Sequence, residues 1–160
     1  MAKSEKQKLK LLYIIQCLME KTDEEHAVTT QEIIDYLALQ GITAERKSIY
    51  TDIDLLIDFG MDIIKKPGRS GGYTLASRQF ELAELKLLVD AVQSSKFITT
   101  KKSRELIGKL ETLCSKYEAT QLHRQVVVTN RNKAVNENIY YNVDIIYNAI
   151  AENVKIQFQY

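Results

Sequence analysis

The sequence predicts a mainly α-helical fold with a small β component. Apolar residues recur every three or four positions along most of the 160-residue chain, which is the spacing of amphipathic helices. Residues 61–75 instead contain two short strand-like segments around a glycine-rich turn. Hydrophobic residues make up 45% of the chain and charged residues 27%, the balance of a globular protein. With one proline and six glycines, low-complexity architectures are excluded.

The first 60 residues predict three helices. Residues 4–21 carry an apolar stripe and form the first helix. The second helix opens at Thr29, whose spacing to Glu32 is that of a capping box, and stops at Gly41. Thr43 is the expected cap of the third helix. The residues expected to face the core are Leu11, Leu12, Ile15, Leu18 and Met19, then Ile33, Ile34, Leu37 and Ala38, then Ile49, Ile53, Leu56 and Ile57.

A β-hairpin is expected after these helices. Residues 61–66 and 72–75 predict its strands, and residues 67–71 its flexible tip. Three helices followed by a hairpin are the element order of a winged helix-turn-helix, which we assign to residues 1–78.

Residues 79–120 predict a helical connector. One helix runs from Phe80 to about Ser95, and a second carries Leu106, Leu110, Leu113 and Tyr117 on one face. Two consecutive amphipathic helices must bury their stripes on each other or on a partner chain. We expect this connector to dimerise.

Residues 121–160 predict a short α/β C-terminal segment. A strand is expected at residues 125–129, a helix at residues 143–151, and a second strand at residues 154–160, where apolar and polar residues alternate strictly. Such a strand must pair with an earlier segment, with another molecule or with further residues. Its alternation up to Tyr160 favours a chain cut inside a larger protein.

The outer face of the third helix is the candidate nucleic-acid site. With Ile49 and Ile53 inward, the helix turns Arg46, Lys47, Tyr50, Thr51 and Asp54 toward solvent. Arg and Lys donate to guanine edges or phosphates, while Tyr and Thr hydroxyls reach phosphate oxygens. A solvated helical face without function explains the same pattern about as well.

The hairpin favours the functional interpretation. Between Ile64 and Phe80 the basic residues are Lys65, Lys66, Arg69 and Arg78, with no acid. Gly68, Gly71 and Gly72 are expected to let the backbone approach a sugar-phosphate chain closely. A basic wing beside a basic helix gives a local electrostatic footprint, and we weigh it above an ordinary hairpin with solubilising lysines.

The total charge argues against a binder that works by bulk positive charge. The formal net charge of the chain is only +1. Residues 1–75 hold 10 Lys and Arg against 12 Asp and Glu, a net charge of −2, and residues 76–160 have a net charge of +3. The acids Asp23, Glu24 and Glu25 are therefore expected on a face away from DNA, and one copy is expected to bind weakly.

Few residues of the sequence are arranged as catalytic or metal-binding groups would be. His26 and His123 lie in different segments without a metal-ligand motif, and Cys114 falls on the apolar side of its helix, as a buried structural thiol would. The tip, residues 68–72, lacks the Lys-Ser/Thr ending of a P-loop. We expect no enzyme, no metal and no cofactor. Without a disulfide framework, a signal peptide or a membrane span, the expected compartment is a reducing cytoplasm.

Three segments resemble one known family in order along the chain. Gly41-Ile-Thr-Ala-Glu-Arg-Lys-Ser-Ile-Tyr-Thr-Asp-Ile53, with Phe59-Gly-Met-Asp-Ile63 and Gly71-Gly-Tyr73, resembles the winged helix of bacterial WYL-domain transcriptional regulators of DeoR-like type. Residues 88–99 and 106–110 are similar to the helical connector of that family. Asn136-Glu-Asn-Ile-Tyr140, Ala149-Ile150 and Ile156-Gln-Phe-Gln-Tyr160 resemble the opening of the WYL domain.

The resemblance implies a sequence-specific DNA-binding regulator that acts as a homodimer on double-stranded DNA. By this resemblance Arg46, Lys47, Ser48, Tyr50 and Thr51 belong to the recognition helix, and Lys65, Lys66 and Arg69 to the wing. Many relatives carry an arginine at the position of Thr51. The chain contains no tryptophan, so the Trp-Tyr-Leu signature and the effector pocket that it implies lie outside these residues.

Two other functions fit the same elements. One is a winged helix that binds a protein and not DNA, which the near-neutral charge keeps open. The other is the regulatory N-terminal part of a larger enzyme, as in biotin-ligase repressors.

Overall fold

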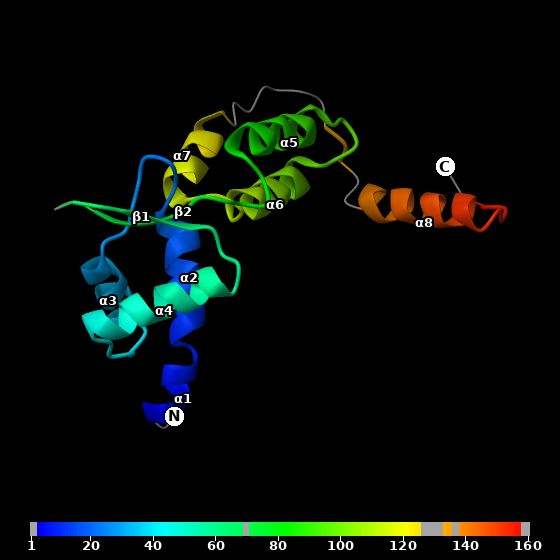
Figure 1. Cartoon of the computed structure of the whole chain (residues 1–160). Coiled ribbons are helices and arrows are strands. Elements are labelled where there is room, and N and C mark those ends of the chain that lie inside the picture. Colours follow the sequence, from blue (N-terminus) through cyan, green and yellow to red (C-terminus); the bar gives the residue numbers. More distant parts are fainter. Residues whose placement is uncertain (1–2, 69–70, 126–132, 136–137, 158–160) are drawn as a thin grey trace.

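The computed structural model describes residues 3–68, 71–125, 133–135 and 138–157. This part of the chain is mainly helical with one two-stranded antiparallel sheet, which confirms the predicted fold class (Figure 1). The N-terminal elements are α1 (Lys3–Lys8), α2 (Lys10–Lys21), α3 (Thr30–Leu39), α4 (Arg46–Asp58), β1 (Ile63–Lys66) and β2 (Gly72–Leu75). They are followed by α5 (Leu82–Ser94), α6 (Thr100–Glu111), α7 (Lys116–Gln125) and α8 (Ile139–Ala151).

One apolar core joins α2, α3, α4 and the sheet. β1 and β2 pair with Ile63 opposite Leu75, and both of these residues are buried on the core. Val28 exchanges two backbone hydrogen bonds with Tyr73, of 2.8 and 3.0 Å, and so adds a one-residue bridge to the other edge of β2. The fully buried residues of the three helices are Ile14, Cys17, Leu18, Ile33, Leu37, Ile49 and Ile53. Three helices and a hairpin on one core are the predicted winged-helix arrangement.

The capping box at the start of α3 is present as predicted. Thr29 Oγ1 accepts a hydrogen bond from Glu32 N (3.2 Å), and Glu32 Oε2 accepts one from Thr29 N (2.7 Å). After α3 the chain turns through Gly41, whose φ of +73° is a left-handed conformation that favours glycine. The residues of α3 that pack inward are Ile33, Tyr36 and Leu37, whereas Ala38 is exposed, contrary to the prediction.

The first predicted helix is interrupted at Leu9, and its buried face differs from the predicted one. α2 buries Ile14, Cys17 and Leu18, while Leu12 and Met19 of the predicted stripe are exposed. The prediction for these two residues was wrong because residues 11–19 are apolar on nearly every side. Spacing alone does not say which side of such a helix meets its neighbours.

The third helix begins two residues later than predicted. Its N-cap is Glu45, and the expected cap, Thr43, instead offers its backbone carbonyl to Gln7 Nε2 at 3.0 Å. Residues 42–45 are not helical; within them Ile42 is buried and Ala44 packs against the core. Arg46 is therefore the first residue of α4.

The connector helices bury their stripes on one another. α5, α6 and α7 pack around Leu85, Val89, Ile107, Cys114 and Leu122. α7 also contacts α2, so the connector is joined to the winged helix (Figure 1). Packing within the chain is one of the two alternatives that the sequence left open.

The second connector helix was predicted to include Tyr117 and is in fact two helices. α6 ends at Glu111, and a new capping box opens α7: Glu118 N donates to Ser115 Oγ (3.1 Å) and Ser115 N donates to Glu118 Oε2 (3.0 Å). The Ser-x-x-Glu spacing of these residues was a visible signal for a helix start. α7 continues past residue 120, where the sequence analysis placed a domain boundary.

The C-terminal helix was predicted at residues 143–151, and α8 covers them. Its large exposed apolar residues are Tyr141, Val143, Ile145, Ile146, Tyr147 and Ile150. Residues 154–157 were predicted as strand, but they have no strand partner in the described part of the chain. Instead Val154 N donates to Ala149 O (3.0 Å), and Asn153, at φ +54°, turns the chain at the end of α8. The predicted strand at residues 125–129 lies outside the described residues, except for Gln125, which ends α7.

Candidate nucleic-acid interface

The outer face of the N-terminal half of α4 carries polar side chains at the predicted positions. Those exposed are Arg46, Lys47, Tyr50 and Thr51. Ile49 and Ile53 fill the core beneath them and fix the rotation of the helix. Arg46 Nη2 donates to Gln31 Oε1 of α3 at 3.2 Å, so the guanidinium lies beside the start of α3. This face presents two cations on the first turn of α4.

Two hydroxyl groups of the same helix already have partners inside the protein. Ser48 Oγ accepts a hydrogen bond from Lys10 Nζ, and this ammonium also lies 2.7 Å from the carboxylate of buried Asp52. Thr51 Oγ1 donates to Lys47 O (3.2 Å). Ser48 therefore helps to hold α2 against α4, and the hydroxyl of Thr51 must release Lys47 O before it donates to a nucleic acid.

The wing lysines also have partners. Lys65 Nζ forms an exposed ion pair with Asp54 of α4, and this hydrogen bond raises the pKa of Lys65. Lys66 Nζ donates to the backbone carbonyl of Glu24 at 3.0 Å. Arg69, the third predicted wing residue, lies outside the described residues.

Two glycines of the hairpin, Gly71 and Gly72, are needed for packing within the protein, whereas the sequence suggested a role in approaching DNA. A Cβ on Gly72 would stand 2.3 Å from Val28 O, and one on Gly71 would stand 2.2 Å from Lys66 O. These two glycines are therefore required by close approach of the protein's own backbone. Gly68, with φ +114° and no atom near its Cβ position, is the glycine on the open side of the tip.

A second basic segment, α1, lies against the loop that leads into α4. Gln7 anchors it through the hydrogen bond to Thr43 O. Lys6 Nζ lies 2.8 Å from the position of a Cβ on Gly41, and Lys8 is exposed. These lysines were not among the predicted site residues, although residues 1–10 contain four lysines against one glutamate.

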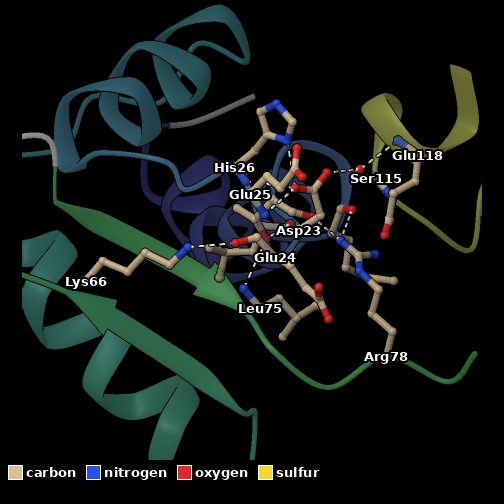
Figure 2. A network of polar contacts seen from close by, with 12 residues as sticks. Asp23, Glu24, Glu25, His26, Lys66, Leu75, Arg78, Ser115 and Glu118 are labelled. Carbon is tan, nitrogen blue, oxygen red and sulfur yellow. Dashed lines mark hydrogen bonds and ion pairs between the residues drawn. The ribbon is translucent and has the colours of Figure 1, made fainter. Parts of the chain in front are cut away.

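The loop after α2 connects the winged helix to the connector. Asp23 was predicted on the surface and is in fact buried, 7% exposed. Figure 2 shows its carboxylate between the two units: Ser115 Oγ donates to Oδ2 (2.6 Å), and His26 N donates to Oδ1 (2.8 Å). The His26 ring stacks on Tyr117 of α7, with centroids 3.7 Å apart. Asp23 was predicted wrongly because its main partner lies 92 residues away in the sequence.

Hydrogen bonding decides the charge of Asp23. Burial by itself favours the neutral acid, but the hydrogen bonds from Ser115 and His26 outweigh it and lower the pKa of the Asp23 carboxyl. The same loop receives Arg78, whose guanidinium donates to Met19 O (2.8 Å) and to Thr22 O. Arg78 therefore caps the last carbonyl groups of α2 and belongs to the polar network in Figure 2. It is not part of a basic surface on the wing.

The winged-helix part of the chain matches a known domain. Residues 12–68 match the family model described as FokI, D3 domain. The matched segment runs from α2 to the tip of the hairpin, about a third of the chain, and supports a DNA-binding, winged-helix-like domain. No curated protein and no solved structure gives a significant match to the chain.

Other chemical groups of the described residues are engaged in structure. Both cysteines are buried, and burial raises the pKa of each thiol to about 11, so the predicted structural role of Cys114 is confirmed. His123 Nδ1 lies 3.1 Å from Glu111 Oε1. No group of three His, Cys, Asp or Glu side chains in the described part of the chain is placed to hold a metal ion.

A cleft of about 780 Å³ lies between the wing and the connector. Lys66, Arg78 and Glu118 line it, and all three already make the hydrogen bonds described above. The cleft is therefore part of the joint between the two units. None of the described helices is long and apolar enough to cross a membrane.

Proposed function

We propose that the chain is the DNA-binding part of a transcriptional regulator, with α4 in the major groove and the wing on the flanking backbone or minor groove. The observation that carries the proposal is the exposed set Arg46, Lys47 and Tyr50 within the segment that matches a DNA-binding domain. The first turns of a recognition helix are the part that meets base edges. Arg46 is positioned there to bind a guanine edge, and Lys47 and Tyr50 to bind phosphates.

The start of α4 also favours an anionic partner. Its first turn carries two cationic residues and no acid, and no side chain caps it, whereas Thr29 caps α3 and Thr99 caps α6. Cations at a helix N-terminus are unfavourable next to the positive end of the helix dipole. A DNA phosphate near this turn reduces the conflict, because backbone N–H groups and Lys47 then face an anion.

The finer parts of the proposal concern assembly and regulation. The outer face of α5 exposes Ala83, Leu87, Leu88 and Ala91, and Leu87 is 71% exposed. We propose that this face forms a two-fold dimer, which suits a palindromic or repeated DNA site. The exposed apolar residues of α8 support a further effector domain beginning in residues 121–160, as in cytoplasmic regulators of the WYL type.

The test is a site selection from a random duplex library, followed by anisotropy titrations of the selected and a scrambled duplex. The parent chain is compared with Arg46→Ala and with a control, Arg104→Ala, which removes another exposed arginine, from α6. A lost base contact is worth about 1–3 kcal/mol, so Arg46→Ala should bind the selected duplex roughly 5- to 150-fold more weakly. The control should bind like the parent.

The outcomes separate specific from non-specific binding. Arg46→Ala is expected to bring the affinities for the selected and the scrambled duplex closer together. If no duplex is enriched and the parent binds none at low salt, DNA binding is excluded. If Arg46→Ala and Arg104→Ala weaken binding equally, α4 is not the recognition helix.

A second candidate function rests on the C-terminal half of α4. Leu55 is 51% exposed, Phe59 just beyond the helix is 83% exposed, and Leu39 at the end of α3 is exposed as well. Exposed apolar residues of this size are typical of a protein-binding surface. Such binding would depend weakly on salt, whereas DNA binding weakens steeply between low and moderate salt.

A further inference from the structure

The N-terminal helix α1 holds its lysines beside the end of α4 that is proposed to enter the groove. Gln7 Nε2 is bonded to Thr43 O, three residues before Arg46, and Lys6 Nζ lies close to Gly41 in the same loop. Behind α1, Lys10 of α2 is fixed to Ser48 and Asp52 of α4. α1 is thus attached to the loop before α4 through its own contacts, and the first residue of α2 is attached to α4 itself.

The cations of this region differ from those of the wing in their partners. No described carboxylate lies within ion-pair distance of Lys6 or Lys8, and the same holds for Lys47 on α4. Lys65 and Lys66 of the wing, by contrast, are bonded to Asp54 and to the carbonyl of Glu24. Lys6 and Lys8 of α1 and Lys47 of α4 therefore have no described acidic partner to release, whereas the two described wing lysines must each release an internal bond.

A cluster of unpaired ammonium groups beside a groove-binding helix suits a polyanion. When a groove contains the first turn of a helix, the flanking sugar-phosphate backbone runs past the loop before that helix. This loop, residues 40–45, is the segment that α1 covers. Lysines bind phosphates as point charges and need no fixed geometry, so the long side chains on a short helix are sufficient.

We propose that α1 is a second DNA-binding element, in which Lys6 and Lys8 bind phosphates on the backbone next to the N-terminal end of α4. This rests on the proposed function, since it assumes that α4 enters the groove. The contacts add affinity and fix the orientation of the domain, but they carry no sequence information. α1 thereby gives a domain of net negative charge a basic contact that Lys65 and Lys66 of the wing supply only by breaking internal bonds.

The test uses the full chain and the double variant Lys6→Gln/Lys8→Gln, which preserves helix propensity because Gln and Lys are similar helix formers. Anisotropy titrations with the selected and the scrambled 30-bp duplex are run between 50 and 200 mM salt. Each phosphate contact changes the slope of log K against log salt by about 0.9. Over this fourfold range the affinity of the parent should fall about 12-fold more than that of the double variant.

The control is Lys101→Gln/Lys109→Gln, which removes two exposed lysines from α6. It should keep the parent slope, and the ratio of affinities for the two duplexes should stay the same in both double variants. A parent slope in Lys6→Gln/Lys8→Gln, or an equal reduction in the control, overturns the proposal for α1. Unchanged circular dichroism and melting temperature show that the variants are folded.

Failure of this inference is distinguishable from failure of the proposed function. If Arg46→Ala lowers the affinity while Lys6→Gln/Lys8→Gln does not, α4 binds DNA without α1. If the parent chain binds no duplex, both proposals fall together.

Discussion

The two basic regions around α4 differ in what their cations contact. In the wing, Lys65 pairs with Asp54, and Lys66 donates to the carbonyl of Glu24. At the other region, the start of α4 with α1, Lys6 and Lys47 have no acidic partner among the described side chains. An ammonium with an internal partner gains less from a phosphate, because it must first release that partner.

This difference shows that a count of basic residues does not rank surfaces. The hairpin and the N-terminal segment are both lysine-rich in sequence, yet Lys65 and Lys66 have internal partners while Lys6 and Lys8 have no acidic partner among the described side chains. An exposed ion pair such as Lys65–Asp54 is worth only about 0–1 kcal/mol, so the wing is weakened as a phosphate-binding surface but not removed.

The largest expected effect on DNA affinity comes from neutralising two cations in one region or in the other. Arg46→Gln/Lys47→Gln and Lys65→Gln/Lys66→Gln each remove two positive charges from the winged helix. The α4 variant should lose at least roughly 30-fold in affinity for the selected duplex, because a base contact and a phosphate contact disappear. The wing variant should lose less than about threefold at 150 mM salt, measured by anisotropy. Equal losses would break the distinction between the regions.

The next effect is on the free energy of unfolding and concerns Asp23, in the loop between α2 and α3. Asp23→Ala should lower the free energy of unfolding by about 2–3 kcal/mol, because Ser115 Oγ and His26 N lose a charged acceptor. Asp58→Ala, at the exposed end of α4, should stay within about 0.5 kcal/mol of the parent. Urea unfolding measures both. A parent-like Asp23→Ala would show that the joint contributes nothing to stability.

The pH dependence of the free energy of unfolding should depend on the same residue, Asp23. The folded pKa of Asp23 is lowered, so the unfolded chain binds this proton more tightly than the folded chain does. Its contribution is therefore complete above about pH 5 and is lost as the pH falls through the folded pKa. Urea midpoints between pH 3 and 7 should decline less steeply in Asp23→Asn than in the parent. Parallel curves would contradict the lowered pKa.

A smaller change, an increase in DNA affinity, should result when Lys65 of the wing loses its internal partner. Asp54→Asn removes the partner of Lys65 and an acid from the outer face of α4. The affinity for a scrambled duplex at 50 mM salt should rise about threefold, the effect of roughly one additional phosphate contact. Asp58→Asn removes the same charge without freeing a lysine and is the matched control. If both variants gain equally, the ion pair does not restrain Lys65.

Local signals in the sequence were sufficient for much of the fold. The capping box of Thr29 and Glu32, the turn at Gly41 and the hairpin were predicted because each depends on residues close together in the chain. The spacing of Ser115 and Glu118 is an equally local signal, and the prediction of one helix through Tyr117 was wrong because the apolar stripe continues across this helix start.

The rest depended on long-range contacts. The burial of Asp23 by Ser115, the bond of Lys66 to the Glu24 carbonyl and the docking of Gln7 on Thr43 join residues at least 36 positions apart. No periodicity in the sequence encodes such pairs. For the candidate site, the face of α4 was predictable from its spacing, but the partners of its cations were not.

The most direct test of this account is the amide chemical-shift change of the labelled chain on adding the selected duplex. The largest changes should fall at residues 6–8 and 41–51, with smaller ones in β1 and β2. Changes confined to Leu39 and residues 55–59, or no saturable change at any duplex concentration, would contradict it.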